Sequence, residues 1–213
     1  MQRLFLLLLI SIDLLIELPI CLYKSEELPV ELILQNPELP SGCEVTSLAM
    51  ALNYLGYQVD KMTLANEFLS KGEIGSTHPD VAFPGDPGGR GYGCNPSVIA
   101  DTVQAYFSSI NETSREIIIL ENKPLCLSSV YLNNNKPVLL WVSTDMKPKT
   151  TFTTWILDDE VYTWYFRFHC VVLVKYSQDT CVVLDPLIGR VEYDTALLEE
   201  IYEDRGSKML VIK

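Results

Sequence analysis

The order of its apolar segments is the feature that most constrains the fold of this chain. In the first half, apolar side chains three or four residues apart predict a helix that Gly56 ends; they are Val45, Leu48, Ala49, Leu52 and Leu55. Residues 96–107 predict another helix, with Pro96 in its first turn. The second half contains short apolar runs separated by turns, at 137–144, 153–157, 161–166, 168–176, 181–184 and 190–193. Helices followed by antiparallel strands predict an α+β fold, with N-terminal helices packed on a C-terminal antiparallel sheet.

Shorter segments complete the expected pattern. We expect further strands at 29–35, 116–120 and 209–212, and further helices at 63–69, 125–132 and 194–203. Residues 72–95 are rich in Gly and Pro and predict a long covering loop with several tight turns, an interpretation that is also compatible with the wall of a cleft. No repeat or linker divides residues 25–213, so the sequence predicts a single domain there.

The first 24 residues differ from this domain. Arg3 precedes an apolar run at 4–10, which predicts an export signal or a membrane anchor. The alternative is an N-terminal helix packed on the domain, because Asp13, Glu17 and Pro19 interrupt the apolar character. An export signal or anchor would make the protein extracellular or membrane-anchored, at a bacterial cell envelope.

Charge and cysteine usage exclude several classes of function. With 16 Lys and Arg against 28 Asp and Glu, the net charge is −12, which repels the phosphate backbone of a nucleic acid. The six cysteines include no CxxC pair and there are two histidines, so the sequence predicts no metal site and no cofactor. We expect most of these cysteines to be small buried residues, and the sequence leaves disulfide pairing open.

The segment Ser41-Gly42-Cys43-Glu44 is the most informative tetrapeptide. Ser41 and Glu44 have the spacing of a capping box before a helix, which would place Cys43 at the second helical position. Unpaired N–H groups and the helix dipole there would lower the pKa of the thiol and make Cys43 a nucleophile. Gly42 would let a substrate carbonyl approach the sulfur. The alternative is a small buried residue at the start of a helix.

A thiolate nucleophile usually needs an imidazole that a third group holds in place. Two segments of the sequence contain a histidine and an acidic residue that could fill these two roles. His169 lies in a strand that is apolar on both faces, and a turn at 178–180 leads to a strand that ends at Asp185. Pairing of the two strands would bring Asp185 to the imidazole as the third member of a triad. The alternatives are an ordinary interior histidine and an ordinary turn residue. His78, in the irregular loop, is interpreted as a surface residue.

Gln35 precedes Cys43 by eight residues, at the end of an expected strand. Its side-chain amide could donate to the oxyanion that forms when a thiolate adds to a carbonyl, beside the backbone N–H of Cys43. The alternative is an ordinary polar residue at a strand end.

These residues together match a family pattern. Gln35 with Ser-Gly-Cys-Glu-Val-Thr-Ser-Leu-Ala-Met at 41–50, His-Cys-Val-Val-Leu-Val at 169–174, and Leu-Asp-Pro-Leu at 184–187 resemble the stand-alone peptidases of cysteine-peptidase family 39, the bacteriocin-leader peptidase-like proteins. The resemblance covers residues 27–213 and implies a papain-like fold. It also implies that Cys43 is the nucleophile, His169 the base, Asp185 the group that orients it and Gln35 the oxyanion donor. The spacing from Gln35 to Cys43 is longer than in leader peptidases fused to transporters.

The function predicted from these residues is a thiol-dependent hydrolase that cleaves peptide or related amide bonds through a Cys-His-Asp triad. Its expected partner is a peptide or protein substrate. We also expect residues 1–24 to tether this chain to a membrane, and the sequence gives no indication of an obligate partner subunit. Two alternatives use the same residues: an inactive peptide-binding module on the same fold, and an acyl transferase.

Overall fold

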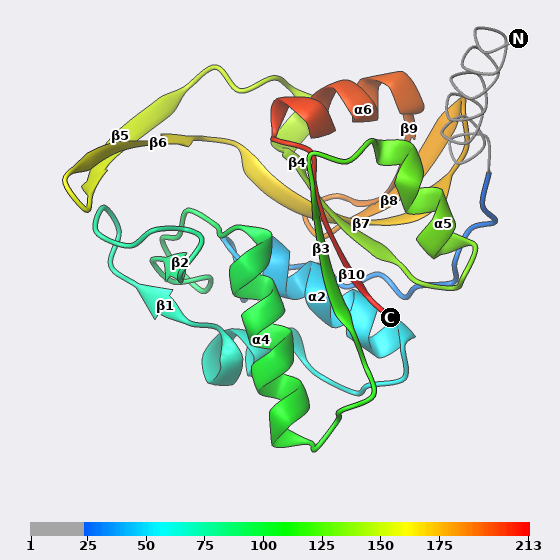
Figure 1. Ribbon diagram of the computed structural model, residues 1–213, viewed down its shortest axis with the longest axis horizontal. Helices are drawn as coiled ribbons and strands as arrows, with labels where there is room; N and C mark the ends of the chain where they lie inside the picture. The colour runs from blue at the N-terminus through cyan, green and yellow to red at the C-terminus, as the bar shows by residue number, and fades with distance from the viewer. Residues whose placement is uncertain (1–23) are drawn as a thin grey trace, which may run out of the picture.

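A six-stranded antiparallel sheet forms the centre of the computed structural model, which describes residues 24–213 (Figure 1). Its strand order is β3-β10-β4-β7-β8-β9. The strands are β3 (Ile117–Glu121), β4 (Val138–Ser143), β7 (Phe168–Tyr176), β8 (Thr180–Asp185), β9 (Gly189–Asp194) and β10 (Lys208–Ile212). The last strand of the chain therefore lies between β3 and β4, inside the sheet.

Helices cover both faces of this sheet. The pair α2 (Cys43–Tyr54) and α4 (Pro96–Ser109) lies on one face, and the pair α5 (Ser128–Leu132) and α6 (Thr195–Asp204) lies on the other (Figure 1). Successive side chains of β4 point to opposite faces of the sheet and so contribute to two hydrophobic cores. Leu139 and Trp141 face the first pair of helices, and Val138, Leu140 and Val142 face the second. The predicted α+β fold, with helices packed on an antiparallel sheet, is confirmed.

A long hairpin extends away from the sheet on the side of β7 and carries β5 (Phe152–Leu157) and β6 (Glu160–Tyr165) (Figure 1). The predicted loop at 72–95 contains mainly turns, and two of its residues form β2 (Phe83–Pro84), which pairs with β1 (Lys71–Gly72). Short helical turns occur at Leu125–Leu127 and Thr144–Met146.

Two local predictions differ from the structure. Residues 29–35 form no strand; Leu28 N–H and Gln35 N–H instead donate single hydrogen bonds to Val174 and Pro186 carbonyls. The reason is that β7 already has β4 and β8 as neighbours, so the segment finds no free strand edge there. The helix expected at 63–69 begins earlier, as α3 (Lys61–Thr63), and continues as a π-helical turn at Leu64–Phe68.

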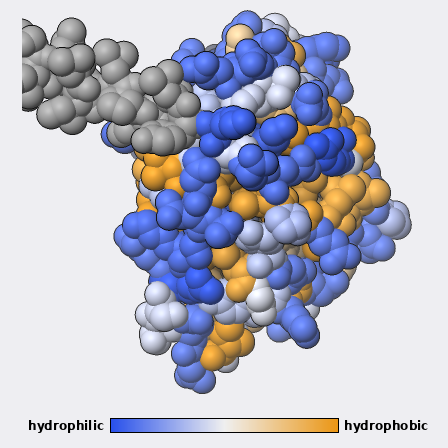
Figure 2. All heavy atoms as spheres, turned by 90° about the vertical axis from the view of Figure 1, so that its right-hand side faces the viewer, coloured by the Kyte–Doolittle hydropathy of each residue, from blue (hydrophilic) through white to orange (hydrophobic). Residues whose placement is uncertain are grey.

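The export signal or membrane anchor predicted for residues 1–24 falls on the segment 1–23, outside the described residues, so it stays a prediction. Among residues 24–213, no helix has the length and apolar character needed to cross a membrane. Figure 2 shows one face of the molecule, where hydrophilic residues cover most of the surface and apolar residues gather in a band between them.

Candidate active site

A pocket of about 160 Å³ brings three of the four predicted site residues together. Gln35, Cys43 and His169 all line it, although they come from the segment before α2, the first residue of α2 and the second residue of β7. Asp185, the fourth residue, lies at the end of β8, where its carboxylate contacts the imidazole of His169. Two neighbouring strands and the start of one helix therefore assemble the site.

The pair formed by His169 and Asp185 is buried and close. Nε2 of His169 lies 2.8 Å from Oδ1 of Asp185, and the two residues are 1% and 4% exposed. The same Oδ1 accepts a 2.7 Å hydrogen bond from the backbone N–H of Leu187, which fixes the carboxylate. The antiparallel register that pairs Val172 with Leu184 creates this contact, as the apolar runs of the two strands predicted.

Cys43 is the first residue of α2, not the second, and the predicted capping box is absent. Gly42 occupies the N-cap position, and no side chain caps the helix. Ser41 Oγ instead donates to the Gly89 carbonyl at 2.9 Å and accepts from the Gly91 N–H at 3.3 Å, so it ties the glycine-rich loop to the site. A side chain at position 42 would place a Cβ 2.7 Å from the Cβ of Leu39, so Gly42 serves packing beneath the site.

The thiol of Cys43 is hydrogen-bonded to a carboxylate that the sequence had assigned to a cap. Sγ donates to Oε2 of Glu44 at 3.2 Å, while Oε1 of Glu44 accepts from the N–H of Cys94 at 2.8 Å. Burial and the charge of Glu44 raise the pKa of the Cys43 thiol well above its ordinary value. The predicted lowering of this pKa by the helix start is wrong, because the two opposing effects outweigh the helix dipole.

Gln35 is held by hydrogen bonds of its side chain, its backbone N–H and its backbone carbonyl. Its side-chain Nε2 donates to the Pro40 carbonyl at 2.9 Å, which leaves the second amide hydrogen for another acceptor. Its backbone N–H donates to the Pro186 carbonyl, next to Asp185. The Nζ of Lys61 donates to the Gln35 carbonyl at 3.0 Å.

Lys61 holds the Gln35 segment by hydrogen bonds that the sequence did not reveal. Besides Gln35, its ammonium group donates to the Leu34 carbonyl at 2.5 Å and to Oε2 of Glu38 at 2.9 Å. In the sequence, the signal was Asp60 before Lys61 at the start of a helix, a pair that is common on protein surfaces. In the structure, Lys61 is buried beneath the Gln35 segment.

Comparison with known proteins decides the family. The model of the Peptidase_C39 like family matches residues 27–209. The chain belongs to this family. It is 29% identical over 202 residues to the uncharacterised protein YvpB of Bacillus subtilis (strain 168), and the match covers 89% of this chain and 78% of YvpB.

Solved structures agree with the family assignment. A candidate C39-like peptidase from Bacillus anthracis is 29% identical, superposes with a TM-score of 0.75, and the match covers 90% of this chain and 98% of that one. The peptidase domain of Streptococcus ComA, a bifunctional ABC transporter, is 10% identical with a TM-score of 0.50 over 86% of this chain and 96% of the domain, which shows a shared fold only. The resemblance to family 39 and the papain-like fold are thus confirmed, and family and fold together support a cysteine-peptidase type of function.

In this member of the Peptidase_C39 like family, the long loop at 72–95 forms one wall of the pocket. Gly91, Tyr92 and Gly93 line it. The Tyr92 ring contacts the rings of Trp155 and Trp164 at centroid distances of 5.2 and 6.3 Å, and these two indoles stack at 6.0 Å. The predicted loop therefore forms a wall of the pocket, as its interpretation allowed, and the hairpin packs against that wall.

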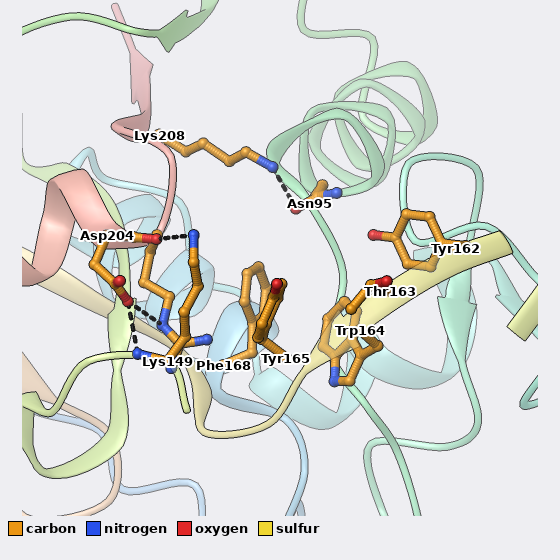
Figure 3. Close-up of a pocket in the computed structure, with 10 residues that line it drawn as sticks. Asn95, Lys149, Tyr162, Thr163, Trp164, Tyr165, Phe168, Asp204 and Lys208 are labelled. Carbon is orange, nitrogen blue, oxygen red and sulfur yellow. Dashed lines mark hydrogen bonds and ion pairs between the residues drawn. The ribbon is translucent and has the colours of Figure 1, made fainter. Parts of the chain in front are cut away.

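A second pocket, of about 120 Å³, adjoins the first and shares Phe168 with it (Figure 3). Its sides carry fixed polar groups: Lys208 Nζ donates to Oδ1 of Asn95 at 2.9 Å, and Lys149 Nζ donates to the Asp204 carbonyl at 2.6 Å. Its aromatic wall consists of Tyr162, Trp164, Tyr165 and Phe168. The hairpin thus lines the surface beside the Cys43 pocket.

Among residues 24–213, the remaining cysteines and the second histidine lie outside the pocket. Cys94, Cys170 and Cys181 are free and buried, as Cys43 is, and Cys126 is disulfide-bonded. In the part of the chain from 24 to 213, no group of three or more His, Cys, Asp or Glu residues is placed to hold a metal ion. His78 is half-buried, and its ring lies against Tyr162 at a centroid distance of 4.6 Å, so it does not join the site.

Proposed function

We propose that this protein hydrolyses peptide or related amide bonds with Cys43 as the nucleophile. The observation that carries the proposal is the buried 2.8 Å contact between His169 and Asp185 at the wall of the pocket that Cys43 lines. A histidine whose Nε2 is held by a carboxylate presents its other nitrogen, Nδ1, as a proton acceptor. Membership of the Peptidase_C39 like family supports the same chemistry.

The first half of the reaction forms an acyl-enzyme. Cys43 Sγ attacks the substrate carbonyl carbon, its proton passes to Nδ1 of His169, and the carbonyl π electrons move to the oxygen. The Cys43 N–H, which has no partner within α2 because it starts that helix, donates to this oxyanion together with the free amide hydrogen of Gln35. Collapse of the adduct expels the amine, which takes the proton from His169.

The second half regenerates the thiol. Water adds to the thioester carbon while His169 Nδ1 accepts a proton from it, and the tetrahedral adduct then releases a carboxylic acid. The thiolate of Cys43 leaves and is protonated by His169. Asp185 stays ionised throughout and stabilises the imidazolium form at each step.

Thiol labelling tests the pairing of Cys43 with His169. A small haloacetamide should modify Cys43 in the full-length protein, and His169→Ala should lower the rate of that modification strongly. His78→Ala is the matched control, because it removes the other histidine, which lies outside the pocket, and should leave the rate unchanged. Cys43→Ser gives the background from other thiols. Equal rates in wild type and His169→Ala would remove the pair from the mechanism.

An inactive peptide-binding module is the second candidate. The Cys43 thiol donates to Glu44 in this structure, and its pKa is raised, which disfavours the thiolate that catalysis needs. A broad peptide library separates the two functions. Hydrolysis by wild type that is lost in Cys43→Ser supports the peptidase. Peptide binding by Cys43→Ser with no turnover by wild type supports the binding module. Added amines in the same assay reveal acyl transfer through their amide products.

A further inference from the structure

Glu44 is a buried carboxyl group in contact with the reacting sulfur, and the mechanism above does not use it. The residue is 1% exposed, and Oε2 accepts the hydrogen bond from Cys43 Sγ at 3.2 Å. Acidic side chains are almost never buried without a partner, because loss of hydration is costly. A carboxyl group at this place therefore needs an explanation beyond packing.

The surrounding backbone fixes the direction of this carboxyl group. Oε1 accepts from the Cys94 N–H at 2.8 Å, and the Cys94 carbonyl accepts from the indole N–H of Trp141 at 2.8 Å. Gly93 has a φ of +89°, and a Cβ there would lie 2.5 Å from Oε1 of Glu44. The Cys94 N–H holds Oε1 in the space that the missing side chain of Gly93 leaves free, and Oε2 therefore faces the sulfur.

The titratable groups around Glu44 come from three elements. Cys43 precedes it on α2, Cys94 lies in the loop before α4, and β7 contributes His169 and Cys170, all within electrostatic range. Burial raises the pKa of the Glu44 carboxyl, while the Cys94 N–H and the His169 imidazole oppose the rise. His169 is the one group among these that can carry a positive charge.

We propose that Glu44 holds Cys43 as a protonated thiol in the resting protein, so that the thiol loses its proton to His169 only when an electrophilic carbon, such as a substrate carbonyl, is in place. In that step the S–H bond breaks, an N–H bond forms at Nδ1 of His169, and the sulfur electron pair forms the C–S bond. The proton-transfer half of this proposal rests on the proposed function; the holding of the thiol does not. A site of this kind avoids a standing thiolate, which is the form that oxidants attack.

Glu44→Gln isolates the charge. The amide keeps an oxygen that can accept from the Cys94 N–H and places an N–H donor, instead of a negative charge, against the sulfur. The measurement is the rate of Cys43 alkylation by a haloacetamide as a function of pH, which needs no substrate. We expect E44Q to react at least about tenfold faster than wild type at neutral pH, the equivalent of a thiol that ionises at least one pH unit lower.

The matched control is Glu31→Gln, which makes the same charge change at an exposed residue outside the pocket and should leave the pH profile unchanged. An unchanged profile for E44Q would make Glu44 a structural residue. A slower reaction would make it the proton acceptor for the thiol. Either result overturns the proposal.

A measurement on wild type covers the case in which E44Q does not fold. The difference in ultraviolet thiolate absorbance between wild type and Cys43→Ser, followed against pH, reports the ionisation of Cys43 alone. A midpoint above that of an ordinary cysteine, about 8.5, supports the protonated resting thiol that the proposal requires, and a midpoint below it refutes the proposal. Failure of the proposed function looks different: the alkylation profiles would behave as expected, but no peptide would be hydrolysed.

Discussion

The hydrogen bond between His169 and Asp185 yields a prediction whose size can be worked out. Both residues are buried and Nε2 lies 2.8 Å from Oδ1. Asp185→Asn keeps an oxygen that can accept from His169 and from the Leu187 N–H, so the geometry survives while the charge is lost. The coulombic attraction of two full charges at this distance, about 6 kcal/mol at an effective dielectric constant near 20, is a ceiling that ignores the cost of desolvation.

The difference between hydrogen bonds measures the net effect better. A bond to a charged partner contributes about 1.5–3 kcal/mol, and a neutral one contributes about 0.5–1.5 kcal/mol. Asp185→Asn should therefore destabilise the imidazolium form of His169 by about 1–1.5 kcal/mol, and the rate of Cys43 alkylation should fall roughly five- to tenfold. Asp185→Ala should reduce it further, because the His169 ring N–H and the Leu187 backbone N–H then lose their acceptor.

The assay is the second-order rate constant of Cys43 alkylation at neutral pH, with Cys43→Ser as background. Asp80→Asn is the matched control, since Asp80 pairs with the half-buried His78 at 3.4 Å, outside the pocket, and should leave the rate unchanged. A rate for Asp185→Asn within about twofold of wild type would refute the reasoning, because the charge would then contribute less than a neutral hydrogen bond does. Thermal unfolding of each variant separates lost chemistry from lost structure.

Three further predictions concern Gln35, Lys61 and Glu44. Gln35→Ala should lower peptide hydrolysis about 100-fold but leave haloacetamide alkylation of Cys43 nearly unchanged, because alkylation forms no oxyanion; a parallel fall in both rates would contradict the oxyanion role. Lys61→Met removes three hydrogen bonds to the Gln35 segment and should lower both the melting temperature and peptide hydrolysis; hydrolysis at the wild-type rate would show that the tether does not position Gln35. Because burial raises the pKa of Glu44 in the native state above its ordinary 4.5, the native state binds this proton more tightly, and stability declines as pH rises above that value. Glu44→Gln should remove this decline, measured as the free energy of unfolding by urea from acid to neutral pH, and equal slopes in both proteins would contradict the assignment.

The strands and long helices were predictable because each depends on a local pattern. The run at 168–176 is apolar on both faces, and β7 is indeed buried between two layers of helices. The contact of His169 with Asp185 followed from the same pattern, since one register pairs the apolar residues of β7 and β8. The segment 29–35 shows the limit: its composition suits a strand, but the chain before it runs beside β7, whose two neighbours β4 and β8 are already in place.

The environment of Cys43 was not predictable, because its partners are distant in sequence. Ser41 and Glu44 have capping-box spacing, but each finds a partner about 50 residues away, in the loop that contains Gly89 and Cys94. A capping box satisfies two N–H groups of one helix, whereas the observed contacts join the start of α2 to the wall of the pocket. Spacing within one segment cannot distinguish these outcomes.

This difference reverses the expected electrostatics of the site. The positive end of a helix stabilises a nearby anion by about 0.3–2 kcal/mol, so a thiol at the first position of α2 should ionise more readily than usual. The burial of the sulfur and, after it, the Glu44 carboxylate at 3.2 Å act in the opposite direction, and together they raise the pKa of the thiol. The two contributions belong to different groups, so they can be separated. In Glu44→Gln the helix start acts without the opposing charge, and in wild type both act together. The difference between the alkylation profiles of these two proteins, compared under the same conditions, therefore measures the share of the raised pKa that comes from the carboxylate.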